Sequence, residues 1–255
     1  MVNKINNRGQ VTIFIIVGIL IFVAILLVFY FTGRISFTES PIQNPEAYLE
    51  NCMINSAKEA ENLIFTSNGY PQLESNYILY NKEKIPYLCI SSEFYNTCIP
   101  QEPAFFSHIN KLIENKVARD TQECLDNLVK ELEKKGYNVQ VDSGNTTVEI
   151  RKDFININLG RKIYFSSGED AGQIPAIETS YGTKIYDMIK LIQIIVNSET
   201  STCDFDKESW MRADSSIIIS RTSLSDQTEI YTLRDRLTER EIKFAIRTCI
   251  LPAAL

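Results

Sequence analysis

The pattern of apolar and polar positions near the start of the chain is unlike the pattern in the remainder. From Val11 to Phe31, 21 consecutive residues carry no charge, and the polar side chains among them are those of Thr12 and Tyr30. As an α-helix this segment is roughly 30 Å long, which is the thickness of a bilayer's hydrocarbon core. Backbone groups in lipid must be hydrogen-bonded within the segment, so the pattern predicts a transmembrane helix. A buried core helix of a soluble domain is the alternative.

Beyond this segment, the pattern predicts the helices and strands of a folded domain. Apolar residues recur at helical spacing in some stretches and alternate with polar residues in others. Predicted helices cover residues 45–68, with Asn44 as N-cap, 103–135, with a kink or break near 119–121, and 181–197. Predicted strands cover residues 85–88, as a short edge strand, 137–141, 148–150, 155–159, 162–166, 216–222, 229–234 and 242–250.

These elements predict an α+β fold in which one N-terminal transmembrane helix is followed by a domain of antiparallel sheet packed against two or three helices. The three strands between residues 137 and 159 are predicted to form an antiparallel meander covered on one face by the long helix. The predicted organisation is a basic leader (1–9), the transmembrane helix (10–32), a linker (33–44), an α+β domain containing the meander (45–166) and a second α/β portion packed on the first (167–255).

The charges that flank the apolar segment predict its orientation. Lys4 and Arg8 precede it with no acidic residue beside them, which favours a cytoplasmic N-terminus and an extracellular main domain. A cleaved secretory signal peptide is the competing interpretation, but the apolar run is long and the aromatic residues 29–31 make a poor cleavage site. The predicted contact with the lipid bilayer is therefore the segment Val11–Phe31.

The residues Arg8-Gly9-Gln10, directly before the apolar run, resemble the class III signal peptide of archaeal pilins and related surface proteins. The resemblance covers about residues 1–31. It implies that a leader peptidase cuts between Gly9 and Gln10 and leaves the apolar helix attached. Phe14 stands where bacterial-type pilins carry an acid, which is a departure from the filament-forming pattern. The alternative is that Arg8 is an ordinary positive-inside residue and Gly9 a loop residue.

The cysteines all follow the apolar segment and are even in number. The six are Cys52, Cys89, Cys98, Cys124, Cys203 and Cys249. On the oxidising side of a membrane this pattern predicts disulfides, with free buried thiols as the alternative. The preferred pairs are Cys89–Cys98, which closes a short loop, Cys52–Cys124, which joins two helices, and Cys203–Cys249, which holds the C-terminal strand. The absence of C-x-x-C makes a zinc site improbable.

The net charge and the surface motifs limit the classes of partner that the protein is expected to bind. The net charge is −6, and it is −8 when Lys4 and Arg8 are set aside, which argues against nucleic acid as a partner. Asn145-Thr146-Thr147 is the single N-x-[ST] sequon and is predicted to lie on a hairpin tip where a glycan can attach. Five aromatic residues either form a recognition surface or, as the favoured interpretation, pack inward: Tyr77, Tyr80, Tyr87, Phe94 and Tyr95.

No catalytic signature is found in the sequence. The single histidine, His108, is interpreted as a surface or capping residue, and the sequence contains no zinc-protease, hydrolase-elbow or nucleotide-loop motif. Asp204, Asp206 and Glu208 alternate as in a calcium loop, but the glycine and glutamate that an EF-hand needs are serines, so a solvated acidic loop is favoured. We therefore expect no enzyme activity, no cofactor and no metal.

Together these features predict a membrane-anchored, pilin-like cell-surface protein whose disulfide-bonded extracytoplasmic domain has a structural or adhesive role. One alternative is a subunit of a type IV-pilus-like filament, with homo-oligomeric neighbours packed through the apolar helix. A second alternative is an anchored solute-binding domain or ectoenzyme, which a deep pocket lined by paired carboxylates would favour.

Overall fold

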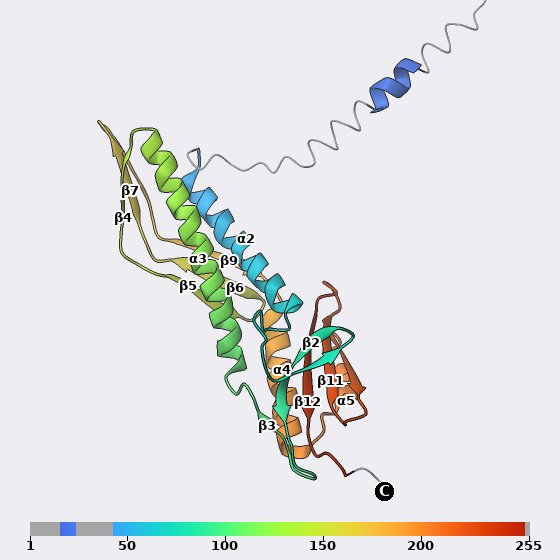
Figure 1. Ribbon diagram of the computed structural model, residues 1–255. Helices are drawn as coiled ribbons and strands as arrows, with labels where there is room; N and C mark the ends of the chain where they lie inside the picture. Colours follow the sequence, from blue (N-terminus) through green and yellow to red (C-terminus); the bar gives the residue numbers. More distant parts are fainter. Residues whose placement is uncertain (1–15, 24–42, 253–255) are drawn as a thin grey trace, which may run out of the picture. The chain divides into compact units, whose positions relative to one another are not determined.

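The computed structural model describes residues 16–23 and 43–252 and divides into two compact units, Met1–Ser40 and Pro41–Leu255 (Figure 1). In the first unit, residues 16–23 are helical and their large apolar side chains are exposed. Within these described ranges, no helix combines the length and apolarity needed to cross a bilayer. Most of the predicted segment Val11–Phe31 and of the predicted linker lies outside the described residues.

In the second unit, the first helix begins where the sequence predicts and ends two residues before the predicted end. Helix α2 spans Pro45–Thr66, and the Asn44 side chain accepts a hydrogen bond of 3.1 Å from the backbone N–H of Ala47. Proline suits the first helical position because its missing N–H would have no partner there. The chain leaves the helix at Gly69, whose φ of +81° is a conformation that glycine adopts at little cost.

Helix α3 spans Phe105–Lys134 without interruption and runs antiparallel to α2. The predicted kink near residues 119–121 is therefore wrong. Asp120 does not cap a new helix; it accepts hydrogen bonds from Ser56 of α2, at 2.7 Å, and from Lys116. Burial alone would raise the pKa of the Asp120 carboxyl, but these hydrogen bonds outweigh it and the pKa is lowered. The polar residues that suggested a break instead join the two helices.

The strands form one larger and two smaller sheets. The larger sheet has the order β1-β2-β12-β11-β10, with β3 also paired to β2, and the smaller ones have the orders β4-β7-β8 and β5-β6-β9. The strands are β1 (Tyr77–Tyr80), β2 (Glu83–Ile90), β3 (Ile99–Pro100), β4 (Asn138–Val141), β5 (Thr146–Arg151), β6 (Phe154–Leu159), β7 (Ile163–Ser167), β8 (Asp170–Ile174), β9 (Ile177–Gly182), β10 (Ile217–Ser223), β11 (Glu229–Asp235) and β12 (Glu241–Arg247).

The pairing confirms an α+β fold with antiparallel sheets but not the predicted meander. Strand β4 pairs with β7 rather than with β5, and the β5–β6 hairpin continues to β9. The chain crosses between the two small sheets at Gly144, where a side-chain Cβ would lie 2.0 Å from the carbonyl oxygen of Gly160. Alternating residues predict that a strand exists, but they do not specify its neighbour.

Strand β2 is an inner strand, so its predicted place at a sheet edge is wrong. It pairs with β1 on one side and, in parallel, with β12 on the other. Pro86 lacks an N–H and would interrupt a ladder of hydrogen bonds. The pairing with β12 begins at Tyr87, one residue after the proline, which allows β2 to lie inside the sheet.

Two helices complete the second unit. Helix α4 (Ile185–Thr202) begins later than predicted because residues 177–182 form β9, and strand β8, which was not predicted, precedes β9. The acidic segment after α4 contains a helix not predicted, α5 (Lys207–Ala213). The predicted boundary at residues 166–167 falls inside β7, and strands from both sides of it share sheets around one main core.

Candidate functional site

All six cysteines form disulfides, in the three pairs preferred from the sequence. Cys52–Cys124 joins α2 to α3, Cys89–Cys98 closes the loop between β2 and β3, and Cys203–Cys249 ties the end of α4 to the segment after β12. The Cα–Cα distances are 6.6, 5.4 and 5.9 Å, which lie in the range a disulfide can bridge.

The loop closed by Cys89–Cys98 carries exposed aromatic side chains. Phe94 is 54% exposed and Tyr95 68%, and beside them Ile99 is 70% and Leu251 55% exposed. We call these four residues the end patch. Tyr77, Tyr80 and Tyr87, by contrast, are half-buried in the sheet. The three tyrosines in the strands therefore pack partly inward, whereas Phe94 and Tyr95 in the loop are exposed, as a recognition surface requires.

The backbone around the end patch is held by hydrogen bonds to the segment after β12. The N–H of Tyr95 donates to the carbonyl of Ile250 at 2.9 Å, and the N–H of Cys249 donates to the carbonyl of Asn96 at 2.9 Å. Tyr95 has a φ of +63°, an uncommon conformation for a residue with a bulky side chain. Cross-links and hydrogen bonds thus fix a strained backbone that presents an aromatic side chain to solvent.

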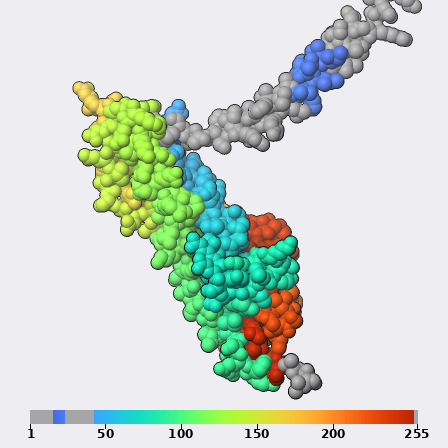
Figure 2. Space-filling model, in the orientation of Figure 1, coloured from blue at the N-terminus to red at the C-terminus, as the bar shows by residue number. Residues whose placement is uncertain are grey.

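The end patch lies at one end of the second unit. In Figure 1 the loop after β2 and the last described residues lie at the end of this unit opposite to the start of α2, and Figure 2 shows both at the surface. The remaining exposed large apolar residues of this unit, such as Leu79 and Leu237, are spread over several elements. Single exposed apolar residues are ordinary, whereas a group of them marks a contact surface.

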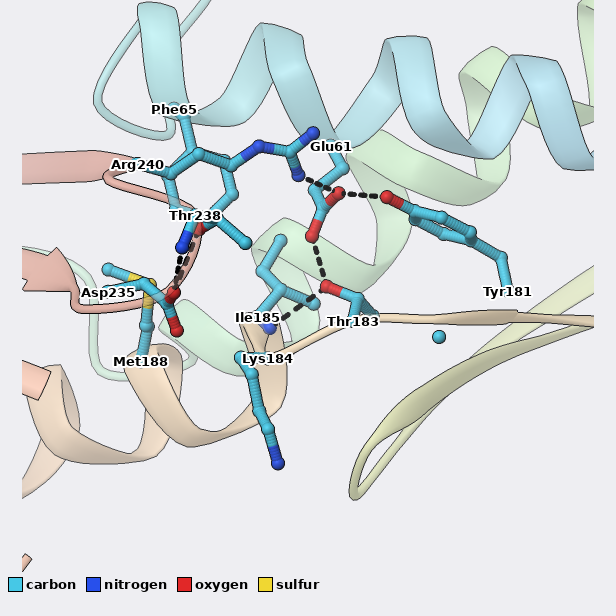
Figure 3. A pocket seen from close by; sticks show the side chains of 11 residues that line it. Glu61, Phe65, Tyr181, Thr183, Lys184, Ile185, Met188, Asp235, Thr238 and Arg240 are labelled. Atoms are coloured by element: carbon cyan, nitrogen blue, oxygen red, sulfur yellow. Dashed lines mark hydrogen bonds and ion pairs between the residues drawn. The ribbon is translucent and has the colours of Figure 1, made fainter. Parts of the chain in front are cut away.

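A buried acidic side chain, that of Glu61, joins three parts of the fold (Figure 3). Only 2% of the residue is exposed, and its carboxylate accepts hydrogen bonds from Arg240, Tyr181 and Thr183. Arg240 follows β11, Tyr181 lies in β9, and Thr183 precedes α4. The Arg240 guanidinium also lies 5.5 Å above the ring of Phe65. A cavity of about 90 Å³ adjoins this cluster, which is too small for most ligands.

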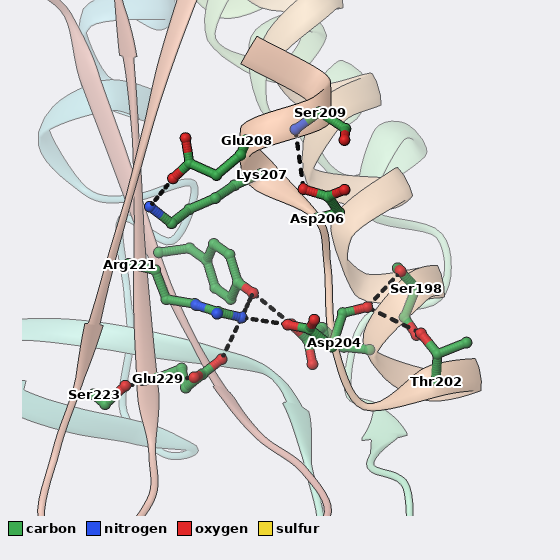
Figure 4. Close-up of polar contacts among 12 residues, drawn as sticks. Ser198, Thr202, Asp204, Asp206, Lys207, Glu208, Ser209, Arg221, Ser223 and Glu229 are labelled. Carbon is green, nitrogen blue, oxygen red and sulfur yellow. Dashed lines mark hydrogen bonds and ion pairs between the residues drawn. The ribbon is translucent and has the colours of Figure 1, made fainter. Parts of the chain in front are cut away.

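A second buried acid, Glu199, has a different environment. The residue is fully buried, one carboxylate oxygen accepts from the Tyr231 hydroxyl, and the other has no partner among the described residues. Burial raises the pKa of Glu199, and the hydrogen bond from Tyr231 offsets only part of this effect. Arg221 donates to the Tyr231 hydroxyl at 3.3 Å and to Asp204 at 2.7 Å (Figure 4). The positive charge of Arg221 also counteracts part of the rise in the pKa of Glu199.

The histidine and the acidic residues that the sequence offers as candidates for catalysis or metal binding make structural contacts. A ring nitrogen of His108 lies 3.0 Å from the carbonyl oxygen of Gly69, and the ring stacks on Tyr70. Asp204 pairs with Arg221, and Asp206 caps α5 by accepting from the N–H of Ser209. Hydrogen bonding to Ser209 lowers the pKa of Asp206. The three acids are exposed as predicted, but the segment is only partly a loop, because Asp206 caps α5 and Glu208 lies in its first turn.

Pockets in the described part of the chain are small or shallow. A partly apolar hollow of about 220 Å³ lies between β3 and α4, below the roughly 300–1,000 Å³ of common ligand sites, and a more open, polar hollow of about 340 Å³ lies over β5 and β6. Residues 16–23 and 43–252 contain no group of three His, Cys, Asp or Glu side chains arranged to hold a metal ion.

Of two further predicted sites, the structure describes the sequon at Asn145 but not the cleavage site. Asn145 lies in the connection before β5, not at the tip of the β5–β6 hairpin, which is formed by residues 152–153; its predicted place on a hairpin tip is therefore wrong. It is nevertheless exposed. Gly9 and Gln10, the predicted cleavage positions, lie outside the described residues.

No family model, curated protein or solved structure matches this chain. The two buried acidic clusters were missed by the sequence reasoning, because Glu61 and Arg240, or Glu199 and Tyr231, are far apart in the chain and belong to no motif. Leu251 was missed as a member of the end patch for the same reason, since it lies more than 150 residues after Tyr95.

Proposed function

We propose that the chain is a membrane-anchored, pilin-like surface protein that holds the unit Pro41–Leu255 outside the cytoplasm, where it makes adhesive contacts. The observation that carries the proposal is that all six cysteines, each placed after the apolar segment, form disulfides. Disulfides persist in oxidising compartments and are rare in the cytosol. Val11–Phe31 would be the anchor, and the basic leader would remain on the cytoplasmic side until cleavage at Gly9–Gln10.

The end patch supports adhesion as the role of the anchored unit. The chain enters this unit at α2, and the exposed aromatic residues lie at its opposite end. A surface at that end is separated, along the unit itself, from the point where the chain enters it. Aromatic side chains also provide large contact areas with few rotatable bonds, which favours recognition.

Topology is tested with the full chain expressed in intact cells. A thiol reagent that adds mass is applied after denaturation, with and without prior reduction, and a membrane-impermeant protease is applied to intact cells. We expect thiols to be modified only after reduction and the unit Pro41–Leu255 to be digested from outside. A chain lacking residues 1–31 serves as the control and should stay protected with reduced thiols. The proposal fails if the full chain behaves as this control does.

The adhesive role is tested by replacing Phe94 and Tyr95 together with serine. Because a buried aromatic contact contributes on the order of 1–2 kcal/mol, we expect the number of attached cells to fall by about tenfold or more. The matched control replaces Leu79 and Leu237, which are 66% and 87% exposed, a range similar to or above that of Phe94 and Tyr95, but lie outside the end patch. Equal attachment of wild type and the Phe94/Tyr95 variant would remove the end patch as the adhesive surface.

A further inference from the structure

We propose that Asn145 carries an N-linked glycan that projects from the solvent face of the sheet β5-β6-β9. The proposal rests on the extracytoplasmic placement in the proposed function, because transfer of such glycans takes place on that side of a membrane. Asn145-Thr146-Thr147 is the single N-x-[ST] sequon of the chain. The structure adds what the motif alone does not provide, which is the accessibility of each of its three residues.

The two residues of the sequon that take part in the transfer face solvent. Asn145 and Thr147 are both exposed, whereas Thr146 between them is buried. Along β5 the buried positions continue at Val148 and Ile150, so the alternation fixes which side of the strand faces water. A glycan on Asn145 would therefore be accommodated without displacing any residue of the core.

The backbone at the sequon is held in place without using the acceptor side chain. The N–H of Gly160 donates to the carbonyl of Asn145 at 3.2 Å, and Arg161 donates to the carbonyl of Gly144 at 2.6 Å and to Gln122 at 2.6 Å. No hydrogen bond among the described residues involves the Asn145 amide. The amide therefore stays free for modification, and its loss would not disturb the connection between β4 and β5.

The surface beside Asn145 is suited to carbohydrate. The solvent face of β5 and β6 forms a shallow hollow lined by Thr147, Glu149, Asn156 and Asn158, together with the backbone of Val148. Hydroxyl, amide and carboxylate groups can exchange hydrogen bonds with sugar hydroxyls. The end patch offers few such groups, so the unit has one polar face for a glycan and one apolar end for a protein contact.

The glycan would be transferred from a donor of a known chemical class, an oligosaccharide joined through phosphate to a polyprenyl lipid. The Asn145 amide nitrogen attacks the anomeric carbon of the first sugar. The bond from that carbon to the phosphate oxygen breaks as the nitrogen–carbon bond forms. The amide gives up one proton to a base of the transferase, and the polyprenyl phosphate or diphosphate leaves with the bonding electron pair.

The test is the intact mass of the full chain, purified from a host that glycosylates N-x-T sequons, compared with four variants. We expect wild type to exceed the sequence mass of its processed chain, which begins at Gln10 if the leader is cleaved as proposed, by one glycan. N145Q and T147A should lose this excess, whereas T147S should retain it because serine also completes a sequon. N158Q, on the same face, is the control for a local disturbance and should retain the excess.

Free thiols are counted in the same samples, so that the two proposals can fail separately. An unmodified wild type with all six cysteines oxidised overturns the glycan and leaves the anchored, extracytoplasmic placement standing. An unmodified wild type with reduced cysteines overturns the placement itself, and the glycan with it. An excess mass that persists in N145Q assigns the modification to another residue and also overturns the proposal.

Discussion

Glu61 and Glu199 are both buried carboxylates, but their surroundings differ in kind. Glu61 accepts three hydrogen bonds, one of them from the guanidinium of Arg240. Glu199 accepts one, from the neutral hydroxyl of Tyr231, and its second oxygen has no partner among the described residues. Burying a charge costs several kcal/mol unless it is paired and fully hydrogen-bonded. The first site therefore pairs its buried carboxylate with a cation and two further donors, whereas the second raises the pKa of its carboxyl and favours the protonated form.

The comparison shows how one residue type serves two purposes in the same unit. At Glu61 the charge determines how α2, β9 and the turn before β12 meet, since each of these elements supplies a partner or the acid itself. Glu199 is fully buried, and the ring of its donor Tyr231 stacks on Phe244 with the ring centroids 5.4 Å apart. Four substitutions, ordered here from the largest expected effect to the smallest, test this difference.

Replacing Glu61 with alanine should have the largest effect. It leaves Arg240, Tyr181 and Thr183 without their acceptor, and removing one partner of a buried pair costs about 3–5 kcal/mol. Arg240 is about one third exposed and can regain water, so we expect a loss near 3 kcal/mol in the free energy of unfolding. Chemical denaturation of the full chain measures it. The double variant E61M/R240M should lose less than E61A; an equal loss would mean that unpaired donors are not the cause.

Replacing Tyr231 with phenylalanine should have the next largest effect. The ring and its stacking on Phe244 remain, but Glu199 loses its hydrogen-bond donor and Arg221 loses an acceptor. Leaving a buried polar group unpaired costs about 1–3 kcal/mol. The loss is measured by denaturation at pH 7 and should shrink at lower pH, where Glu199 is neutral. A loss that does not change with pH would show that Glu199 does not depend on the tyrosine.

Replacing Glu199 with glutamine should stabilise the protein at neutral pH and change its pH dependence. The pKa of Glu199 in the folded chain is raised above its ordinary value of 4.5, chiefly by burial. Its contribution to stability is therefore fully present below about pH 4.5 and is lost as the pH rises through the folded-state pKa. Thermal unfolding from pH 4 to pH 8 should show a smaller decline in E199Q than in wild type. Parallel declines in the two proteins would contradict this interpretation of the site.

Replacing Tyr181 with phenylalanine should have the smallest effect, and it is the matched control for Tyr231. Glu61 keeps Arg240 and Thr183 as donors when the Tyr181 hydroxyl is removed. We expect a loss of about 0.5–1.5 kcal/mol, the net contribution of one hydrogen bond, with no dependence on pH between 5 and 8. Denaturation under the conditions used for Y231F gives the comparison. If Y181F and Y231F lower the free energy of unfolding equally, the number of hydrogen-bond donors left to each carboxylate does not explain the difference between the two sites.

Local features were the most predictable from the sequence. Asn44 and Pro45 determine where α2 begins, and Gly69 with its positive φ determines where the chain turns, because capping depends on residues within one helical turn. The disulfide pairs were also predicted, since the cysteines fall on elements recognisable from their periodicity. Asp120 was misinterpreted because a polar residue in a long helix has the same local pattern whether it caps a helix or binds a neighbouring one.

Sheet pairing was less predictable, for a physical reason. The alternation in β4 and β5 predicted two strands but not that they belong to different sheets, because hydrogen bonds between strands are the same for any partner. Strand β9 was missed, and its last two residues were assigned to the following helix; it becomes a strand by pairing with β6. The members of the end patch are likewise brought together by chain segments more than 150 residues apart.

The sequence by itself determined the apolar segment, the sequon and the three long helices of the second unit, because each depends on residues near one another in the chain. The tertiary structure decided which acids are buried, which strands are neighbours, and that Tyr95 and Leu251 share one end of the second unit. Burial and pairing depend on contacts between distant segments, and a linear pattern of apolar and polar residues does not encode which segments those are.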